Sequence, residues 1–440
     1  MNHNRVLSVN EQAMELLNRQ KGSFNIVTIT RIKGKIREEF LRKSLEAVQR
    51  IHPLLNSRII GTLNSLEFTT DGTEKIPLSI VDSGVNQNWQ DVVREELNKT
   101  IDSHKVLLRC ILYQESGLQT SYLITTVHHA ISDGLSCINL QSEILKCYQK
   151  IASGHSVEVD SLPPLPSLEE LLPKWMQGNK GVSKGKWFLL ESKLKMILHK
   201  PEQLKSEKTV SLEFRSCAMT HRFLKKEITQ KLIELCRQEN TTVQGAICAA
   251  MLLTISNKIK MGKTRKINLS CNSYVDLRRR LEPPIRNEYM GFFASLITTF
   301  HQIKPQMSFW DLSRDVTKNI EAGLKRKDIF KPIMMFRKIL EFYIENPDNS
   351  SITVSVTNIG KVNIPDIYGD LEIEEISFVP SQTIFGKIFT VAVTTFKDQM
   401  ILNFVASQPS ISQDTVEMLA NNVINCLEEV CQEKVAIAVK

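Results

Sequence analysis

Strand-like and helix-like segments alternate near the start of the chain, and this alternation constrains the fold more than any other sequence feature. Residues 24–32 (FNIVTITRI) have the composition of a strand, and residues 36–51 (IREEFLRKSLEAVQRI) have apolar residues at helical spacing. Residues 54–60 (LLNSRII), which follow His52 and Pro53, are again strand-like. A strand, a helix and a second strand in this order predict an α/β fold built of layers.

A hairpin is predicted further along the chain, and it ends at two adjacent histidines. Residues 106–114 (VLLRCILYQ) and 121–129 (SYLITTVHH) are strand-like and are separated by the polar turn ESGLQT. A helical pattern then runs over residues 135–151, directly after Gly134. The histidines are therefore predicted to lie where a strand gives way to a helix, a common place for functional groups in α/β folds.

The chain is long enough for two lobes. A length of 440 residues exceeds what one ordinary hydrophobic core supports. Residues 160–173 (DSLPPLPSLEELLP) carry four of the fifteen prolines, and this density favours a boundary. We expect an N-terminal lobe over residues 1–165, a proline-rich crossover over 160–173 and a C-terminal lobe over 174–440.

The second half repeats the mixture of helices and strands. Residues 245–255 (GAICAAMLLTI) form the longest apolar run, which predicts a buried helix because a bilayer span needs about 18 to 20 residues. Strand-like residues 389–396 and 400–406 are separated by a short polar segment and predict a hairpin. The chain as a whole is therefore expected to be an α/β protein with mixed sheets packed with helices.

Composition excludes several classes of protein. The first thirty residues contain no apolar core of the kind found in a secretion signal, so we expect a cytoplasmic protein without a transmembrane segment. The nine cysteines include no CxxC pair, which favours buried thiols over a metal site or a disulfide framework. The formal charge of +8 is compatible with an anionic partner, although solubility alone explains an excess of this size.

The sequence HHAISDG, residues 128–134, is the feature that carries chemistry. A histidine can accept a proton from a hydroxyl or amine near neutral pH, because its pKa is ordinarily about 6.5. Successive side chains on a strand point to opposite faces, so only one of His128 and His129 is expected to face a cleft. Asp133 either orients a histidine or forms an ion pair elsewhere. A lone histidine is usually structural and a DG pair is usually a turn, but these residues occur together.

The rest of the sequence favours direct attack over covalent catalysis. No serine or cysteine stands in a nucleophile-elbow context such as GxSxG. No phosphate-binding loop or dinucleotide fingerprint is present, so activation of a free acid by ATP is not expected. An acyl group that arrives as a thioester needs only a base and donors for the oxyanion.

HHAISDG resembles the HHxxxDG signature of the chloramphenicol-acetyltransferase-like superfamily. This superfamily includes the condensation domains of peptide synthetases, alcohol acyltransferases and polyketide-associated acyltransferases. The resemblance extends over nearly the whole chain through four weaker motifs in matching order: HPLLNSRI (52–59), SLPPLPSLEELLP (161–173), SYVDLRRRLEPPIRNEYMGFFAS (273–295) and SVTNIG (355–360). The plant branch with the DFGWG motif is disfavoured, because that motif is absent.

The resemblance implies a fold and a role for each motif residue. It implies two similar α/β lobes with the active-site tunnel between them, and His129 as the general base. It implies a structural ion pair between Asp133 and an arginine of the other lobe, for which Arg278 is expected, with Arg279 and Arg280 left open. Gly134 would let the acyl carrier arm pass close to the backbone, since glycine has no Cβ.

Residues of the SVTNIG segment are the remaining site candidates. Thr357 and Asn358 either contact the substrate or the developing oxyanion, or simply form a turn between strands. His128 is expected to serve stability more than chemistry. No metal and no cofactor are expected.

The function implied is transfer of an acyl group from a phosphopantetheine thioester, on coenzyme A or an acyl carrier protein, to an alcohol. A stand-alone condensation enzyme that forms an amide with an amine acceptor is the first alternative. A non-catalytic module that docks a carrier protein is the second. We expect a monomer that acts on a small-molecule acceptor and does not bind nucleic acid.

Overall fold

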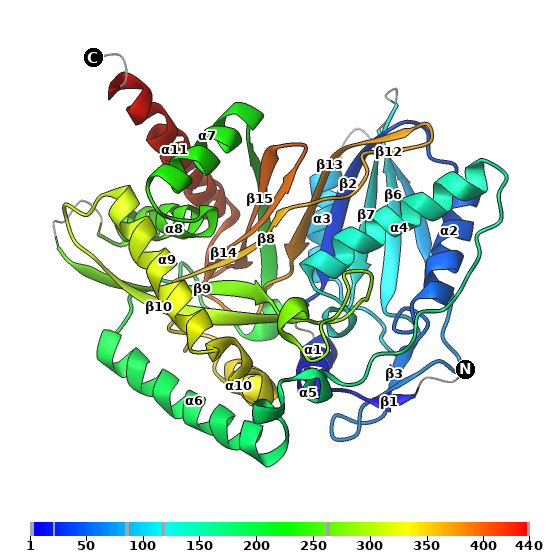
Figure 1. Ribbon diagram of the computed structural model, residues 1–440, viewed down its shortest axis with the longest axis horizontal. Helices are drawn as coiled ribbons and strands as arrows, with labels where there is room; N and C mark the ends of the chain where they lie inside the picture. Colours follow the sequence, from blue (N-terminus) through cyan, green and yellow to red (C-terminus); the bar gives the residue numbers. More distant parts are fainter. Residues whose placement is uncertain (1–3, 21–22, 84–87, 116–118, 261–264, 438–440) are drawn as a thin grey trace. The chain divides into compact units, whose positions relative to one another are not determined.

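The computed structural model describes residues 4–20, 23–83, 88–115, 119–260 and 265–437. The chain forms two compact units, and each combines helices with strands (Figure 1). The first unit contains residues 1–177, 277–293 and 362–381, and the second contains residues 178–276, 294–361 and 382–440. The predicted α/β class is confirmed.

The first unit contains the first 177 residues of the chain and two later segments. Its helices are α1 (Val9–Arg19), α2 (Glu38–Ile51), α3 (Trp89–Asn98), α4 (Gly134–Ala152) and α5 (Leu168–Leu171), and its 3₁₀ turns are η1 (His129–Ile131), η2 (Lys174–Met176) and η4 (Arg278–Arg280). Its strands are β1 (Arg5–Val6), β2 (Ile26–Lys33), β3 (Arg58–Ile60), β4 (Glu67–Thr69), β5 (Leu78–Asp82), β6 (Leu108–Gln114), β7 (Thr120–Val127), β12 (Ile367–Tyr368) and β13 (Leu371–Pro380).

A mixed sheet with helices on both faces forms the core of this unit. Within its described residues, six strands pair in the order β12-β13-β2-β7-β6-β5, all antiparallel except β5 with β6. The side chain of Thr125 contacts Gln141 of α4, and that of the next residue, Thr126, contacts Glu96 of α3. Because successive side chains on a strand point to opposite faces, α4 and α3 cover opposite faces of the sheet.

The predicted hairpin is confirmed, whereas the predicted strand after the first helix is only partly correct. β6 and β7 pair antiparallel from Leu108 opposite Val127 to Gln114 opposite Ser121. Of residues 54–60, however, only Arg58–Ile60 are a strand, and β3 pairs with β4 in a separate small sheet, ordered β1-β4-β3. The chain turns after α2 because Leu55 and Asn56 donate backbone hydrogen bonds to the carbonyl oxygen of His52.

The two compact units differ at two places from the lobes expected from the sequence. Residues 277–293 and 362–381 were assigned from the sequence to a C-terminal lobe over 174–440, but they pack in the first unit. The second segment contains β13, which pairs antiparallel with β2 along the sheet. The proline-rich residues 160–173 lie wholly within the first unit, whose first segment ends at Gln177. Pairing of β13 with β2 and the hydrogen bonds of Arg278 and Phe293 to Asp133 place these segments in the first unit, and composition does not reveal such long-range contacts.

The second unit has the remaining elements. Its helices are α6 (Gly178–His199), α7 (Lys226–Gln238), α8 (Val243–Lys260), α9 (Phe309–Lys325), α10 (Phe336–Glu345) and α11 (Gln413–Ile437), and its 3₁₀ turns are η3 (Leu212–Phe214), η5 (Asp328–Phe330) and η6 (Ile333–Met335). Its strands are β8 (Ser216–Leu224), β9 (Ile267–Asp276), β10 (Ala294–Ile303), β11 (Val354–Lys361), β14 (Phe389–Phe396) and β15 (Gln399–Gln408).

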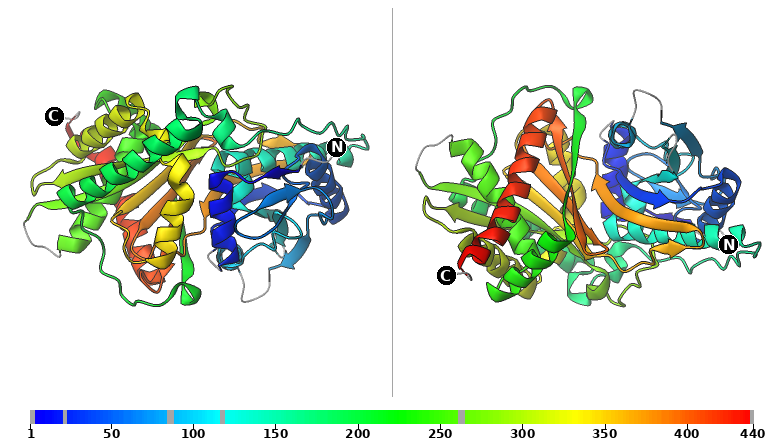
Figure 2. Two further views of the ribbon diagram at one scale, coloured as in Figure 1. Left: turned by 90° about the horizontal axis from the view of Figure 1, so that it is seen from below. Right: turned by 90° about the horizontal axis from the view of Figure 1, so that it is seen from above.

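These strands also form one mixed sheet, whose arrangement can be followed in Figure 2. Over the described residues of the unit the strand order is β10-β9-β11-β14-β15-β8, and β11 runs parallel to both of its neighbours. β14 and β15 pair antiparallel, which confirms the second predicted hairpin. Every residue of β14 is buried, as expected for a strand in the middle of a covered sheet.

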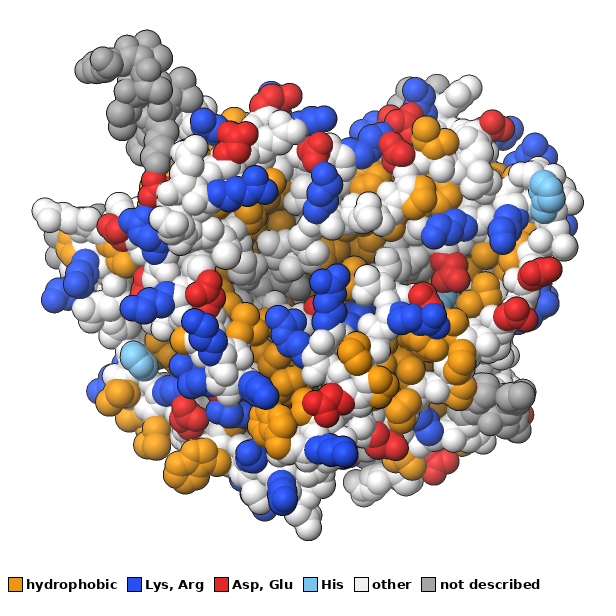
Figure 3. Space-filling view, viewed as in Figure 1, with side chains coloured by type: hydrophobic (Ala, Val, Ile, Leu, Met, Phe, Trp, Pro, Cys, Tyr) orange, Lys and Arg blue, Asp and Glu red, His pale blue; other side chains and the backbone are white. Residues whose placement is uncertain are grey.

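The apolar run at residues 245–255 lies inside α8, as predicted, and α8 is the centre of this unit's core. It packs against α9 and α11 and against β9 and β11. In the described part of the chain, no single helix has the length and hydropathy of a membrane span, and α7 with α8 meets those criteria only as a pair bent by 102°. By contrast, α6 lies on the surface of the second unit, at the lower left of Figures 1 and 3.

Candidate active site

The motif histidines lie in a tight turn directly after β7. The sequence placed both at the end of the strand, but β7 ends at Val127 and His129 begins the turn η1. Two hydrogen bonds turn the chain here: the Ala130 backbone N–H donates to His128 Nδ1 (3.1 Å), and the Ile131 N–H donates to the His128 carbonyl (3.0 Å). The two side chains therefore have different partners because of the turn, and not because of strand alternation.

The ring of His129 is held in one tautomer. Its Nδ1 lies 2.8 Å from the carbonyl oxygen of Ser132. A carbonyl oxygen only accepts hydrogen bonds, so Nδ1 carries the hydrogen and Nε2 of the neutral ring carries the basic lone pair. The ring stacks on Phe24 with centroids 5.6 Å apart and contacts Phe292 at 4.6 Å, and these contacts fix its plane.

The surroundings of His129 favour the neutral, basic form. Its side chain is only partly exposed. Burial lowers its pKa from the ordinary value of 6.5, and this effect outweighs the hydrogen bond to Ser132, which acts in the opposite direction. Near neutral pH the ring is therefore deprotonated and can accept a proton at Nε2.

His128 is buried and lies against a buried carboxylate. Its Nε2 is 3.0 Å from Oε2 of Glu15 in α1. Glu15 also accepts hydrogen bonds from Ser103 Oγ (2.6 Å) and Arg19 Nε (2.6 Å). Burial by itself would raise the pKa of Glu15, but His128, Ser103 and Arg19 outweigh it and lower that pKa. Sequence reasoning missed Glu15, because a glutamate at a buried position of an amphipathic helix has no distinguishing pattern.

Asp133 caps helix α4 and binds an arginine. Its Oδ1 accepts the backbone N–H of Ser136 (2.8 Å), the position preferred for an acidic N-cap residue. Arg278 donates from Nη1 to Oδ2 (2.9 Å) and from Nη2 to Oδ1 (3.0 Å), and the Phe293 N–H also donates to Oδ2 (3.0 Å). Burial would raise the pKa of Asp133, but Arg278 foremost outweighs it, so that pKa is lowered.

The residues that surround this ion pair come from the loop 277–293 and from the first turn of α4. Arg278 is fully buried, lies over the ring of Phe293 at 4.8 Å, and donates to Ser136 Oγ at 2.7 Å. Ser136 Oγ in turn donates to the Gly291 carbonyl (3.1 Å). The resemblance had implied an ion pair across two lobes. The loop belongs to the first unit, however, so the Asp133–Arg278 pair forms inside that unit.

Gly134 makes room for an aromatic ring. A Cβ at this position would lie 2.7 Å from Cε2 of Phe378 in β13, closer than Cβ atoms approach other atoms. The glycine therefore allows α4 to pack against β13. Passage of an acyl carrier arm beside it remains a prediction from the resemblance.

Thr357 and Asn358 are far from the histidines in sequence and belong to the other unit. Both are partly exposed residues of β11 in the second unit. The Oδ1 of Asn358 accepts the backbone N–H of Gly360 (2.8 Å), which directs its amide hydrogens elsewhere. The structure thus brings His128, His129, Asp133, Gly134 and Arg278 together in one unit, whereas Thr357 and Asn358 belong to the other.

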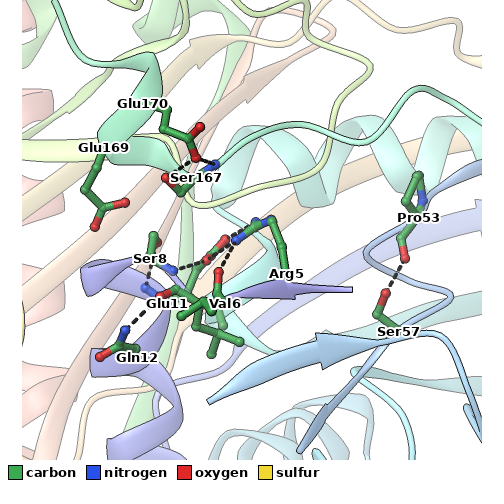
Figure 4. Close-up of polar contacts among 12 residues, drawn as sticks. Arg5, Val6, Ser8, Glu11, Gln12, Pro53, Ser57, Ser167, Glu169 and Glu170 are labelled. Carbon is green, nitrogen blue, oxygen red and sulfur yellow. Dashed lines mark hydrogen bonds and ion pairs between the residues drawn. The ribbon is translucent and has the colours of Figure 1, made fainter. Parts of the chain in front are cut away.

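A cavity of about 420 Å³ opens elsewhere in the first unit. Its walls include His52, Phe68, the proline-rich residues 162–166 and Tyr289, but none of the motif residues 128–134. Figure 4 shows the polar contacts beside it, among them the two hydrogen bonds (2.6 and 2.7 Å) by which Arg5 binds Glu11. Among the residues that the structure describes, no three His, Cys, Asp or Glu side chains form a metal-binding group.

Comparison with known proteins gives the fold a family context. Residues 215–405 match the family described as phthiocerol/phthiodiolone dimycocerosyl transferase C-terminus. Polyketide synthase associated protein 5 from Mycobacterium tuberculosis superposes with a TM-score of 0.73 over 98% of both chains, at 19% identity. TRI3, a trichothecene 15-O-acetyltransferase from Fusarium sporotrichioides, superposes with a TM-score of 0.74 over 97% of this chain and 95% of that one, at 12% identity.

The chain has the chloramphenicol-acetyltransferase-like fold of condensation domains and acyltransferases. Bacitracin synthase 1 from Bacillus licheniformis is 20% identical over 436 residues, which cover 95% of this chain. The chain spans at most 8% of the length of the synthetases that it matches. The superfamily resemblance seen in HHAISDG therefore agrees with both the family match and the fold.

Proposed function

We propose that this protein is a condensation-type acyltransferase that moves an acyl group from a phosphopantetheine thioester to an alcohol, with His129 as general base. The observation that carries the proposal is the state of His129. Its Nδ1–H is engaged by the Ser132 carbonyl, so the basic lone pair of the neutral ring is on Nε2. The fold and the family match supply the context in which such a base acts on acyl groups.

The reaction requires one proton relay and no covalent enzyme intermediate. His129 Nε2 takes the proton of the acceptor hydroxyl as its oxygen attacks the thioester carbonyl carbon. The tetrahedral intermediate then collapses, the C–S bond breaks, and the imidazolium returns the proton to the leaving thiolate. Asn358 and Thr357 are proposed to contact the substrate or the developing oxyanion, because the Asn358 amide has hydrogens to donate once its oxygen is bound to Gly360.

Two observations favour an alcohol over an amine as acceptor. The segment SVTNIG (355–360) resembles the ester-forming branch, and the relative TRI3 is named as an O-acetyltransferase. Natural-product or lipid biosynthesis in the cytoplasm is the setting that we propose for this activity, with coenzyme A or an acyl carrier protein as donor.

Thiol release tests the proposal directly. The full chain is incubated with acyl-coenzyme A of several chain lengths, or acyl carrier protein, with and without panels of alcohols and amines. We expect free thiol and ester in equal amounts, dependent on the alcohol. Amide product would support the condensation alternative. Donor binding without any thiol release would support a docking module, and acylation from a free acid that requires ATP would overturn the thioester proposal.

A further inference from the structure

Helix α6 exposes an unusual apolar stripe to solvent. Five of its large apolar side chains are exposed: Trp187 (68%), Leu190 (48%), Leu194 (59%), Ile197 (66%) and Leu198 (81%). Their spacing of three, four, three and one residues puts them on one face of the helix. Water-facing stripes of this composition are uncommon on soluble surfaces, which makes this face a candidate for interaction.

The opposite face of α6 accounts for its packing on the protein. Gly181 and Gly185 are its buried positions, and a Cβ at Gly185 would lie 2.8 Å from Cγ of Met335 in η6. The large apolar residues on this side, Phe188, Leu189 and Met196, are only partly exposed, whereas the five residues of the stripe point to solvent.

Lysines border the stripe on both sides. Helical spacing puts Lys186 and Lys193 along one edge of it and Lys184 and Lys195 along the other. The whole helix contains five lysines and one acidic residue, Glu191. Glu191 forms an ion pair with Lys195 at 2.7 Å. In Figure 3, orange side chains over α6 at the lower left lie among blue ones.

We propose that α6 binds the surface of an anionic lipid bilayer. A basic helix with tryptophan and leucine on its free face lies in the headgroup plane, with its apolar stripe in the acyl boundary and its lysines on anionic headgroups. Self-association is disfavoured by charge, because two copies of this face would bring their lysines together. The helix lies on the membrane and does not span it. This surface belongs to the second unit, whereas His129 belongs to the first, and the proposal does not rest on the proposed reaction.

Vesicle flotation of the full chain tests the proposal. We expect binding to vesicles with phosphatidylglycerol, little binding to pure phosphatidylcholine, and weakening as salt rises from about 0.05 to 0.5 M. The double variant Leu194→Glu/Leu198→Glu should bind at least about tenfold less. Lys186→Gln/Lys193→Gln should lose about fivefold for each lysine. Both should keep the wild-type melting temperature, because all four side chains are exposed.

Phe214→Glu is the matched control, because Phe214 is 71% exposed in the same unit but lies in η3. This variant should bind vesicles like the wild type. The proposal is overturned if the wild type fails to float with anionic vesicles at low salt, or if the stripe and control variants bind equally. It is also overturned if the stripe variant only abolishes self-association in light scattering, which would make α6 a contact between copies.

Discussion

At the scale of single residues, His129 is where the proposed chemistry is concentrated. His129→Ala removes the base and should lower kcat/KM by about 100- to 10,000-fold. The side chain is partly exposed at the start of the turn η1, so the variant should melt at nearly the wild-type temperature. Initial rates of thiol release and a thermal melt check both expectations. Full activity in a properly folded His129→Ala protein would remove His129 from the mechanism.

The pH dependence follows from the direction of the His129 pKa. Because burial lowers that pKa below 6.5, the neutral base predominates at pH 7 and activity should fall only as pH drops below 6.5. The free energy of unfolding should depend on pH in the same direction. Because the pKa of His129 is lower in the folded protein, the unfolded chain binds its proton more tightly. The stability associated with neutral His129 is therefore fully present above pH 6.5 and is lost as the pH falls toward the folded-state pKa. A profile of kcat/KM from pH 5 to 8 should show its acid inflection below 6.5, and an inflection above 6.5 would contradict the assignment.

At the scale of elements, the ion pair joins the start of α4 to the loop 277–293. Asp133→Ala or Arg278→Ala leaves a buried partner uncompensated and should each cost about 3 to 5 kcal/mol. The double variant should cost much less than the sum, because no lone charge remains. Hydrogen exchange at the α4 amides measures these losses locally. Arg279→Ala, at an exposed neighbouring position, is the control and should change little, whereas additive losses at the pair would show that it does not interact.

The contact between α4 and β13 makes a second prediction at this scale. Gly134→Ala adds a methyl group 2.7 Å from the Phe378 ring and should destabilise the first unit by about 1 to 3 kcal/mol. The same substitution in a Phe378→Leu background should cost less, because the obstructing ring atoms are gone. Urea unfolding of the four proteins gives the coupling. Equal costs in both backgrounds would mean that Phe378 is not what requires the glycine.

The local sequence predicted individual helices and strands better than it predicted which elements pack against one another. Both hairpins and the buried helix α8 were predicted, because alternation and apolar runs are local. The resemblance of HHAISDG to a known motif led to the expected pairing of Asp133 with Arg278, which the structure contains. Glu15 and Phe24 were missed, since each looks like an ordinary member of its own segment. Pairing of β13 with β2 could not be predicted either, because register between distant strands depends on the whole sheet.

At the scale of the whole molecule, the excess of positive charge makes a prediction about the donor. A chain with a formal charge of +8 should attract anionic coenzyme A or an acidic carrier protein at low ionic strength. Raising salt from about 0.05 to 0.5 M shortens the Debye length from roughly 14 to 4 Å, so kcat/KM for the donor should fall. Turnover at saturating donor should change little, because encounter no longer limits the rate.

A sucrose series of matched osmolality separates charge screening from general effects of solute and should leave kcat/KM nearly unchanged. If salt and sucrose act alike, or if salt has no effect, electrostatic steering of the donor is excluded. Thioester chemistry at His129 would survive that result, because it depends on the proton relay and not on long-range attraction. Electrostatic steering and catalysis can therefore be tested separately. Steering depends on the net charge of the whole chain, whereas the proposed catalysis depends on the tautomer of His129.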